Sequence, residues 1–166
     1  MSNSAPKISP EHPFLNREVI INFSSGVVET LQTMAGVESH FEKPFVEKNW
    51  KAEGDYSVYL NLESAPYTGQ IAFHFPKNAL AELYEKMLGQ KIDPDSPEIV
   101  DCMGELSNMC YGYAKGKLNE KGFALKMTLP RPGRTKDFPP VLSKHPHIVI
   151  PFKIFEKNCF IQIVIF

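Results

Sequence analysis

Residues 96–122, SPEIVDCMGELSNMCYGYAKGKLNEKG, carry the longest helical pattern of the chain and decide its fold. Ser96 is a favourable N-cap residue, and Pro97 suits the first helical position, where its missing N–H costs nothing. Gly122 is suited to ending a helix because glycine adopts left-handed backbone conformations without strain. The segment therefore predicts a helix over residues 97–121.

Apolar and polar side chains of this helix divide between two faces. A helical wheel gathers a broad apolar stripe that we expect to face the core: Ile99, Cys102, Met103, Leu106, Met109, Cys110 and Tyr113. On the opposite face, at steps of four, three, four and three, stand Asp101, Glu105, Asn108, Gly112 and Lys115.

Several residues on the polar face lower the stability of the helix slightly. Two acidic residues four apart repel by a few tenths of a kcal/mol, and Asn and Gly are poor helix formers. A purely structural helix would place Lys or Gln there, and a bare Gly112 one turn beyond Asn108 lets another protein approach the backbone. Two interpretations follow, a functional face or a solvated face with one incidental Asn.

Helices and hairpins alternate in blocks along the rest of the chain. The patterns predict a helix over 16–36, a hairpin over 55–75 with its turn at 65–69, a helix over 77–88, a strand over 123–129, an irregular loop over 131–147, and a terminal hairpin of 148–155 and 159–166 around Glu156-Lys157-Asn158. Such an order is typical of an α+β domain in two layers, a largely antiparallel sheet packed against long helices.

The composition is that of one ordinary globular domain. The chain has 166 residues, 43% hydrophobic and 22% charged, with a net charge of −1 that gives no field for recruiting nucleic acid. No apolar run reaches the ~20 residues of a membrane span, the start lacks a secretory h-region, and three cysteines make no disulfide framework, so we expect a cytoplasmic protein. Residues 1–13 hold three prolines and predict a disordered tail before a single domain over 14–166.

The last strand, CFIQIVIF over 159–166, is apolar at nearly every position. Such a strand is normally covered on both faces or paired at a subunit edge. This favours a homodimer.

Other motifs offer weaker chemistry. His145 and His147 with Cys159 could ligate a metal, but a proline separates the histidines and a fourth ligand is missing, so loop histidines are the simpler interpretation. The run from Gly112 to Lys117 looks like a phosphate-binding loop, yet it is too short and lies inside the helix. No Ser/His/Asp constellation is readable.

Two further groups read as structural. Cys102 and Cys110 would stand about 12 Å apart on one helix, too far for a disulfide, and we expect both to be buried. Arg131, Arg134 and Lys136 form a small basic cluster, either a solvated loop or a partner contact.

The octapeptide from Asp101 to Asn108 resembles the D-x3-E-x2-N signature of the CheC/CheX/FliY chemotaxis phosphatases, and most closely their CheX-like members. The resemblance extends over about residues 16–166, including the flanking stretches 81–89 and 122–130. CheC-like members typically carry two signature helices, whereas the first helix here offers Glu29 and Gln32 without a Glu-x2-Asn pair.

The resemblance implies removal of phosphate from the phospho-aspartate of a CheY-like response regulator. It implies that Asn108 orients the attacking water and that Glu105 binds the active-site Lys of the regulator, with Asp101, Gly112 and Lys115 in partner binding. The regulator would bring its own Mg²⁺, so no cofactor or metal of this chain is expected. The alternative is a response-regulator-binding or scaffold module of the same fold without catalysis.

Overall fold

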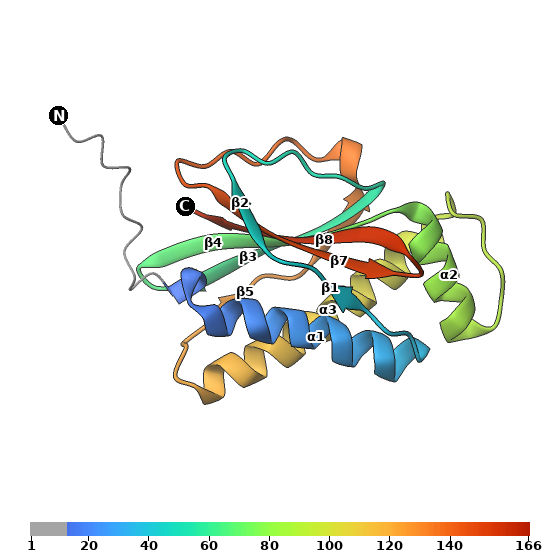
Figure 1. Ribbon diagram of the computed structural model, residues 1–166, viewed down its shortest axis with the longest axis horizontal. Coiled ribbons are helices and arrows are strands. Elements are labelled where there is room, and N and C mark those ends of the chain that lie inside the picture. The colour runs from blue at the N-terminus through green and yellow to red at the C-terminus, as the bar shows by residue number, and fades with distance from the viewer. Residues whose placement is uncertain (1–12) are drawn as a thin grey trace.

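The computed structural model describes residues 13–166, in which two long helices pack on one face of an antiparallel sheet and a shorter helix lies at one end against them (Figure 1). This confirms the α+β architecture expected from the sequence. The predicted tail lies outside the described residues except for Pro13, which begins a short 3-10 helix, Pro13–Leu15.

The helices begin and end where their capping residues predict. They are α1 (Arg17–Ala35), α2 (Lys77–Leu88) and α3 (Pro97–Glu120). The Asn16 side chain accepts a hydrogen bond of 2.9 Å from the Glu18 N–H at the start of α1. Gly36 and Gly89 close α1 and α2 with φ of 63° and 71°, the left-handed conformation that glycine adopts most easily.

Within residues 13–166 one sheet holds eight strands, in the order β1-β7-β8-β4-β3-β5, with β2 beside β7 and β6 beside β3. All strand pairings in this part of the chain are antiparallel. The strands are β1 (His40–Phe41), β2 (Phe45–Glu47), β3 (Tyr56–Ser64), β4 (Tyr67–Phe75), β5 (Lys126–Met127), β6 (Arg131–Arg134), β7 (His147–Ile154) and β8 (Lys157–Ile165).

The predictions for the sheet edges were wrong in three places. Of the strand expected over 123–129, only the two residues of β5 pair with β3. The loop expected over 131–147 contains a further strand, β6, which also pairs with β3. Pro132 is tolerated in β6 because, among residues 13–166, no strand pairs with the outer side of β6. At the opposite edge, the pairing of β1 and β2 with β7 was missed because both segments are too short to show a period.

The terminal hairpin turns earlier than the sequence suggested. Phe155 and Glu156 form a two-residue turn with φ of 49° and 62°, so β8 starts at Lys157. Two consecutive positive φ angles are the geometry that joins twisted antiparallel strands most closely.

The apolar C-terminal strand is satisfied within one chain. β8 lies between β4 and β7, and its residues Cys159, Ile161 and Ile163 belong to the core between sheet and helices. On its other face Phe160 contacts Trp50, with ring centroids 5.2 Å apart, under the loop segments that cross this side of the sheet (Figure 1). The strand is therefore covered on both faces and is no evidence for a homodimer.

Helices α1 and α3 pack with their backbones in close contact. A Cβ atom added at Gly26 would stand 2.7 Å from the carbonyl oxygen of Cys110, so only glycine allows this approach. Burial raises the pKa of the Cys110 thiol to about 11. Cys102 is only half-buried, contrary to expectation, although its thiol pKa is also raised to about 11. Among residues 13–166 each helix is too short or too polar to cross a lipid bilayer.

Candidate active site

Helix α3 presents to solvent the polar face predicted from the sequence. Its five members are exposed: Asp101, Glu105, Asn108, Gly112 and Lys115. Opposite them, buried residues fix the helix to the core along its length: Ile99, Met103, Leu106, Ser107, Cys110, Tyr111, Ala114 and Leu118. The exposed face is therefore held on a rigid element, which positions side chains better than a loop does.

The apolar stripe was predicted correctly at Ile99, Met103, Leu106 and Cys110, whereas Cys102 and Tyr113 are half-buried and Met109 is exposed. Met109 is 41% exposed and lies beside Asn108, while Tyr111, Ala114 and Leu118 take the core positions. The contact face shifts along the helix because 3.6 residues per turn do not keep a repeat of seven in line, and because α1 approaches α3 at Cys110.

A groove runs beside this face, with a volume of about 520 Å³. One wall is α3 and the other is the segment that leads from β5 into β6; the lining residues are Asp101, Gly104, Glu105, Asn108, Leu129, Pro130 and Pro132. Leu129 is 84% exposed, an unusual position for a large apolar side chain. A Cβ atom at Gly104 would stand 3.3 Å from Cγ of Pro132, so this glycine allows the second wall to pack close against α3.

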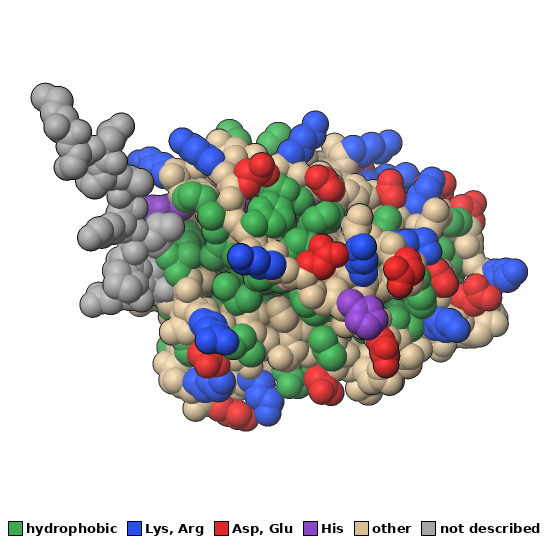
Figure 2. Space-filling view, viewed as in Figure 1, with side chains coloured by type: hydrophobic (Ala, Val, Ile, Leu, Met, Phe, Trp, Pro, Cys, Tyr) green, Lys and Arg blue, Asp and Glu red, His purple; other side chains and the backbone are tan. Residues whose placement is uncertain are grey.

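The polar groups of the groove are free to meet a partner. Within residues 13–166 the side chains of Asp101, Glu105 and Asn108 form no hydrogen bond or ion pair, whereas Glu98 on the same helix accepts a 2.9 Å hydrogen bond from the Tyr84 hydroxyl. On the face of the molecule that carries α1, shown in Figure 2, Lys and Arg side chains are interspersed with Asp and Glu, so no large block of one sign dominates that face.

The groove holds no activated nucleophile of its own. Its lining contains no Ser, Thr, Cys or His. The nearby Cys102 thiol has its pKa raised to about 11 by burial and, second, by the negative charge of Glu105, so it stays protonated at neutral pH. The groove therefore offers carboxylate and carboxamide groups together with apolar surface.

The proposed metal ligands do not converge. His147 accepts a 2.9 Å hydrogen bond from the Gln162 amide on the outer face of the sheet, while Cys159 faces the core on the other side. No group of three or more potential metal ligands occurs in the described part of the chain. The run from Gly112 to Lys117 is helical, and Arg134 of the basic cluster pairs with Asp95 at 3.5 Å.

The second wall of the groove was missed by sequence reasoning. Leu129, Pro130 and Pro132 come to the groove because β5 and β6 both pair with β3, a long-range pairing that no local pattern records. The available signal was weak: an exposed Leu between a short strand and a pair of prolines.

Comparison with known proteins supports one family. A family model described as chemotaxis phosphatase CheX matches residues 57–153. The fold resembles a CheC-like superfamily protein from Shewanella sp. PV-4, with 28% identity and a TM-score of 0.80 over 92% of this chain and 99% of that chain. It also resembles the chemotaxis protein CheX from Vibrio vulnificus, with 29% identity and a TM-score of 0.77 over 90% of this chain and 99% of that chain.

A more distant match shares the fold alone. It is CheX of Borrelia burgdorferi, in a complex with CheY, BeF₃ and Mg²⁺, with 20% identity and a TM-score of 0.72 over 89% of this chain and 97% of that chain. No curated protein matches the chain in sequence. The matched segment 57–153 contains all of α3 and both walls of the groove. The chain therefore belongs to the CheX family of chemotaxis phosphatases.

Proposed function

We propose that this protein hydrolyses the phospho-aspartate of a CheY-like response regulator, with Asn108 and Glu105 as the residues that act on the partner's site. The observation that carries the proposal is their placement. Both stand on the exposed face of α3, three residues apart and hence about one turn, with unpaired side chains beside an open groove. Family membership supports the reaction class.

The reaction asks little of this chain. A water oxygen attacks the phosphorus, the bond between phosphorus and the aspartate oxygen breaks, and inorganic phosphate and the free carboxylate leave. The regulator supplies the reactive acyl phosphate, a Mg²⁺ ion and a Lys that neutralise the developing charge. What remains is to hold the water in line, which the carboxamide oxygen of Asn108 does by accepting a hydrogen bond from it.

Glu105 has a separate role in this proposal. Its carboxylate binds the active-site Lys of the regulator through a charge-assisted hydrogen bond. Asp101, one further turn back, adds a negative charge at the rim, and Gly112 and Lys115 extend the contact along α3.

Apolar contacts complete the docking surface. Leu129 and Met109, 84% and 41% exposed, stand on either side of the signature residues. Burial of such side chains against a partner releases water and stabilises the complex by roughly 25 cal/mol per Å². In this proposal Asn108 gives the chemistry, and the apolar residues add to the affinity that Glu105 supplies.

Phosphate release from a receiver domain phosphorylated by a small-molecule donor tests the proposal. The wild-type protein is expected to accelerate release, and Asn108→Ala is expected to lose ~100-fold or more of that acceleration, the scale of one preorganised transition-state group. Glu120→Ala, an exposed change at the end of the same helix, is the control and should match wild type. A folded Asn108→Ala protein with wild-type rates would instead favour a binding or scaffold module.

We also propose a cytoplasmic homodimer, now on different grounds. Strand β2 has no partner on its outer side among residues 13–166, and its Phe45 and Val46 are 40% and 66% exposed. An exposed apolar edge of this kind pairs readily with a second chain. Light scattering at micromolar concentration should give twice the chain mass, and Val46→Lys should restore the monomer.

A further inference from the structure

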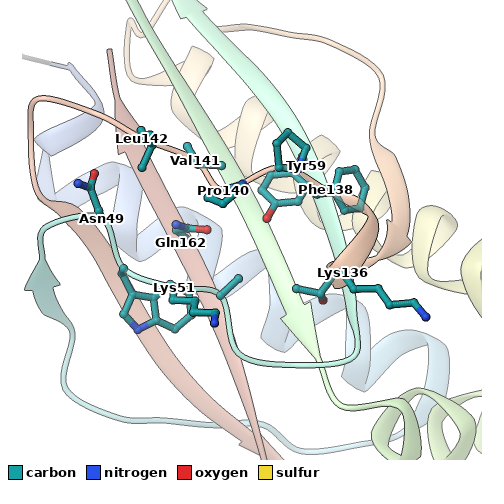
Figure 3. A pocket seen from close by; sticks show the side chains of 13 residues that line it. Asn49, Lys51, Tyr59, Lys136, Phe138, Pro140, Val141, Leu142 and Gln162 are labelled. Atoms are coloured by element: carbon teal, nitrogen blue, oxygen red, sulfur yellow. The ribbon is translucent and has the colours of Figure 1, made fainter.

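A second cavity lies on the outer face of the sheet, away from the helices and from the groove (Figure 3). Its volume is about 490 Å³, within the range of small-molecule sites. Tyr59 and Gln162 form its floor on strands β3 and β8, and the segment from Phe138 to Leu142 crosses above them. Trp50 closes one side.

A continuous chain of hydrogen bonds fixes the floor. The Ser57 hydroxyl donates to Nδ1 of His74 at 2.7 Å, and Nε2 of His74 donates to Oε1 of Gln162 at 2.9 Å. The Gln162 amide then donates to Nδ1 of His147 at 2.9 Å. Both ends of the Gln162 amide are used, and each of these side chains is buried. The direction of each bond follows from the acceptor role of Oε1, so the network has one consistent arrangement.

Aromatic rings fix the walls. The Trp50 ring stands 5.6 Å from the His74 ring, and the Tyr59 ring stands 4.6 Å from that of Phe138, measured between centroids. Rings that are held by neighbours lose little freedom when a ligand binds. The cavity is therefore preformed and suited to a flat apolar body.

The charge at the rim is of one sign. Lys51 and Lys136 line the cavity, and no Asp or Glu is among its lining residues. Neither lysine forms an ion pair with any residue of the described chain. In Figure 3 the Lys136 side chain extends from the rim away from the cavity, so Lys51 is the cation at its mouth. An unpaired ammonium group beside an apolar cavity complements an anion better than a neutral or cationic ligand.

We propose that this cavity binds a small aromatic organic anion, with its rings between Trp50 and Phe138 and its charged group toward Lys51. The proposal is independent of the phosphatase reaction, because Tyr59 and Gln162 point away from α3 on alternate positions of their strands.

The single tryptophan of the chain is Trp50, so energy transfer from it reports directly on this cavity. Two probes share the same rings: anilinonaphthalene sulfonate is anionic, and N-phenylnaphthylamine is neutral. We expect saturable transfer to the sulfonate with one site per chain. The variant Lys51→Glu should weaken sulfonate binding by about tenfold or more and leave the neutral probe within about threefold, because a charge-assisted contact is worth ~1.5–3 kcal/mol.

Two further variants make the test specific. Lys43→Glu changes the same charge at an exposed position outside the cavity and should leave both probes unaffected. Val141→Phe fills the cavity and should abolish transfer to both. Circular dichroism checks that each variant is folded, and phosphate release gives a second check where the wild-type protein shows that activity. If the wild-type protein shows no phosphatase activity, this inference still stands, because it does not depend on that reaction.

Three results would overturn the proposal. If the charge reversal at Lys51 weakens binding of both probes equally, the site has no preference for an anion. If Val141→Phe leaves binding unchanged, the probes do not bind in this cavity. Sulfonate binding that rises on dilution would show that a second copy of the chain covers this face instead.

Discussion

At the scale of single residues, Glu105 and Asn108 stand on one face but have separable effects. If Glu105 binds the regulator's Lys, Glu105→Ala should raise KM by roughly 10- to 150-fold. A high regulator concentration should then restore much of the wild-type rate, because kcat changes little. Steady-state phosphate release over a range of regulator concentrations measures both constants. Asp101→Ala should cost less because a rim charge is screened by salt. A fall in kcat alone in Glu105→Ala would contradict the binding role.

Leu129 offers a second test at this scale. Leu129→Ser should raise KM by about tenfold with kcat unchanged, because the side chain contributes apolar area to docking and no chemistry. Leu142→Ser is the matched control, since Leu142 is 68% exposed but lies on the other face of the sheet. Neither change should lower the free energy of unfolding by more than about 0.5 kcal/mol. Equal KM values for the two variants would remove Leu129 from the docking surface.

At the scale of elements, the helices were predictable and the sheet edges were not. Asn16, Ser96 and Gly36 act within a turn of their own backbone, so a local pattern fixes where α1 and α3 begin and where α1 ends. The pairing of β6 with β3 joins residues that are far apart in sequence, and Pro132 argues against a strand on local grounds. The exposure of Met109 likewise depends on where α1 packs against α3. The hydrophobic pattern of α3 alone does not show where that contact lies.

The contact between α1 and α3 predicts opposite effects at two glycines. Gly26→Ala should lower the free energy of unfolding by about 1–3 kcal/mol, because the added methyl group meets the Cys110 carbonyl at 2.7 Å. Gly116→Ala, where nothing lies within 4 Å, should raise it by up to ~1 kcal/mol through helix propensity. Urea unfolding measures both changes. Equal effects of the two substitutions would mean that the helices do not pack this closely.

At the scale of the whole molecule, the buried hydrogen-bond chain ties stability to pH. Burial lowers the pKa of His74 from 6.5 to about 4 despite its hydrogen bond to Gln162, and burial also lowers the pKa of His147. Between about pH 6.5 and pH 4 the unfolded chain binds protons that the folded chain does not. Stability therefore is complete above this range and falls as the pH drops through it.

The expected loss is about 1.4 kcal/mol for each pH unit from His74 alone. Urea unfolding at several pH values measures the slope, and His74→Gln should flatten it. His40→Gln removes an exposed histidine and should leave the slope unchanged. A wild-type slope in His74→Gln would show that other groups carry the acid sensitivity.

The site as a whole was only half predictable. The polar face of α3 follows from spacing alone, and the family signature gives roles to Glu105 and Asn108. The facing wall depends on the long-range pairing of β5 and β6 with β3, which brings Leu129 and Pro132 beside the helix. Sequence reasoning thus found the exposed polar face of α3 and missed the surface that lies beside it, while the roles of Glu105 and Asn108 stay a prediction.

The close approach of Pro132 to Gly104 has a consequence for partner choice. Where Gly104 stands, any larger residue pushes Pro132 outward from the 3.3 Å contact and widens the groove, while the buried side of α3 stays as it is. Discrimination between similar partners rests on such differences in fit rather than on total affinity. A substitution at position 104 that shifts Pro132 is therefore expected to change which partners fit the groove while Glu105 and Asn108 keep their places on the helix.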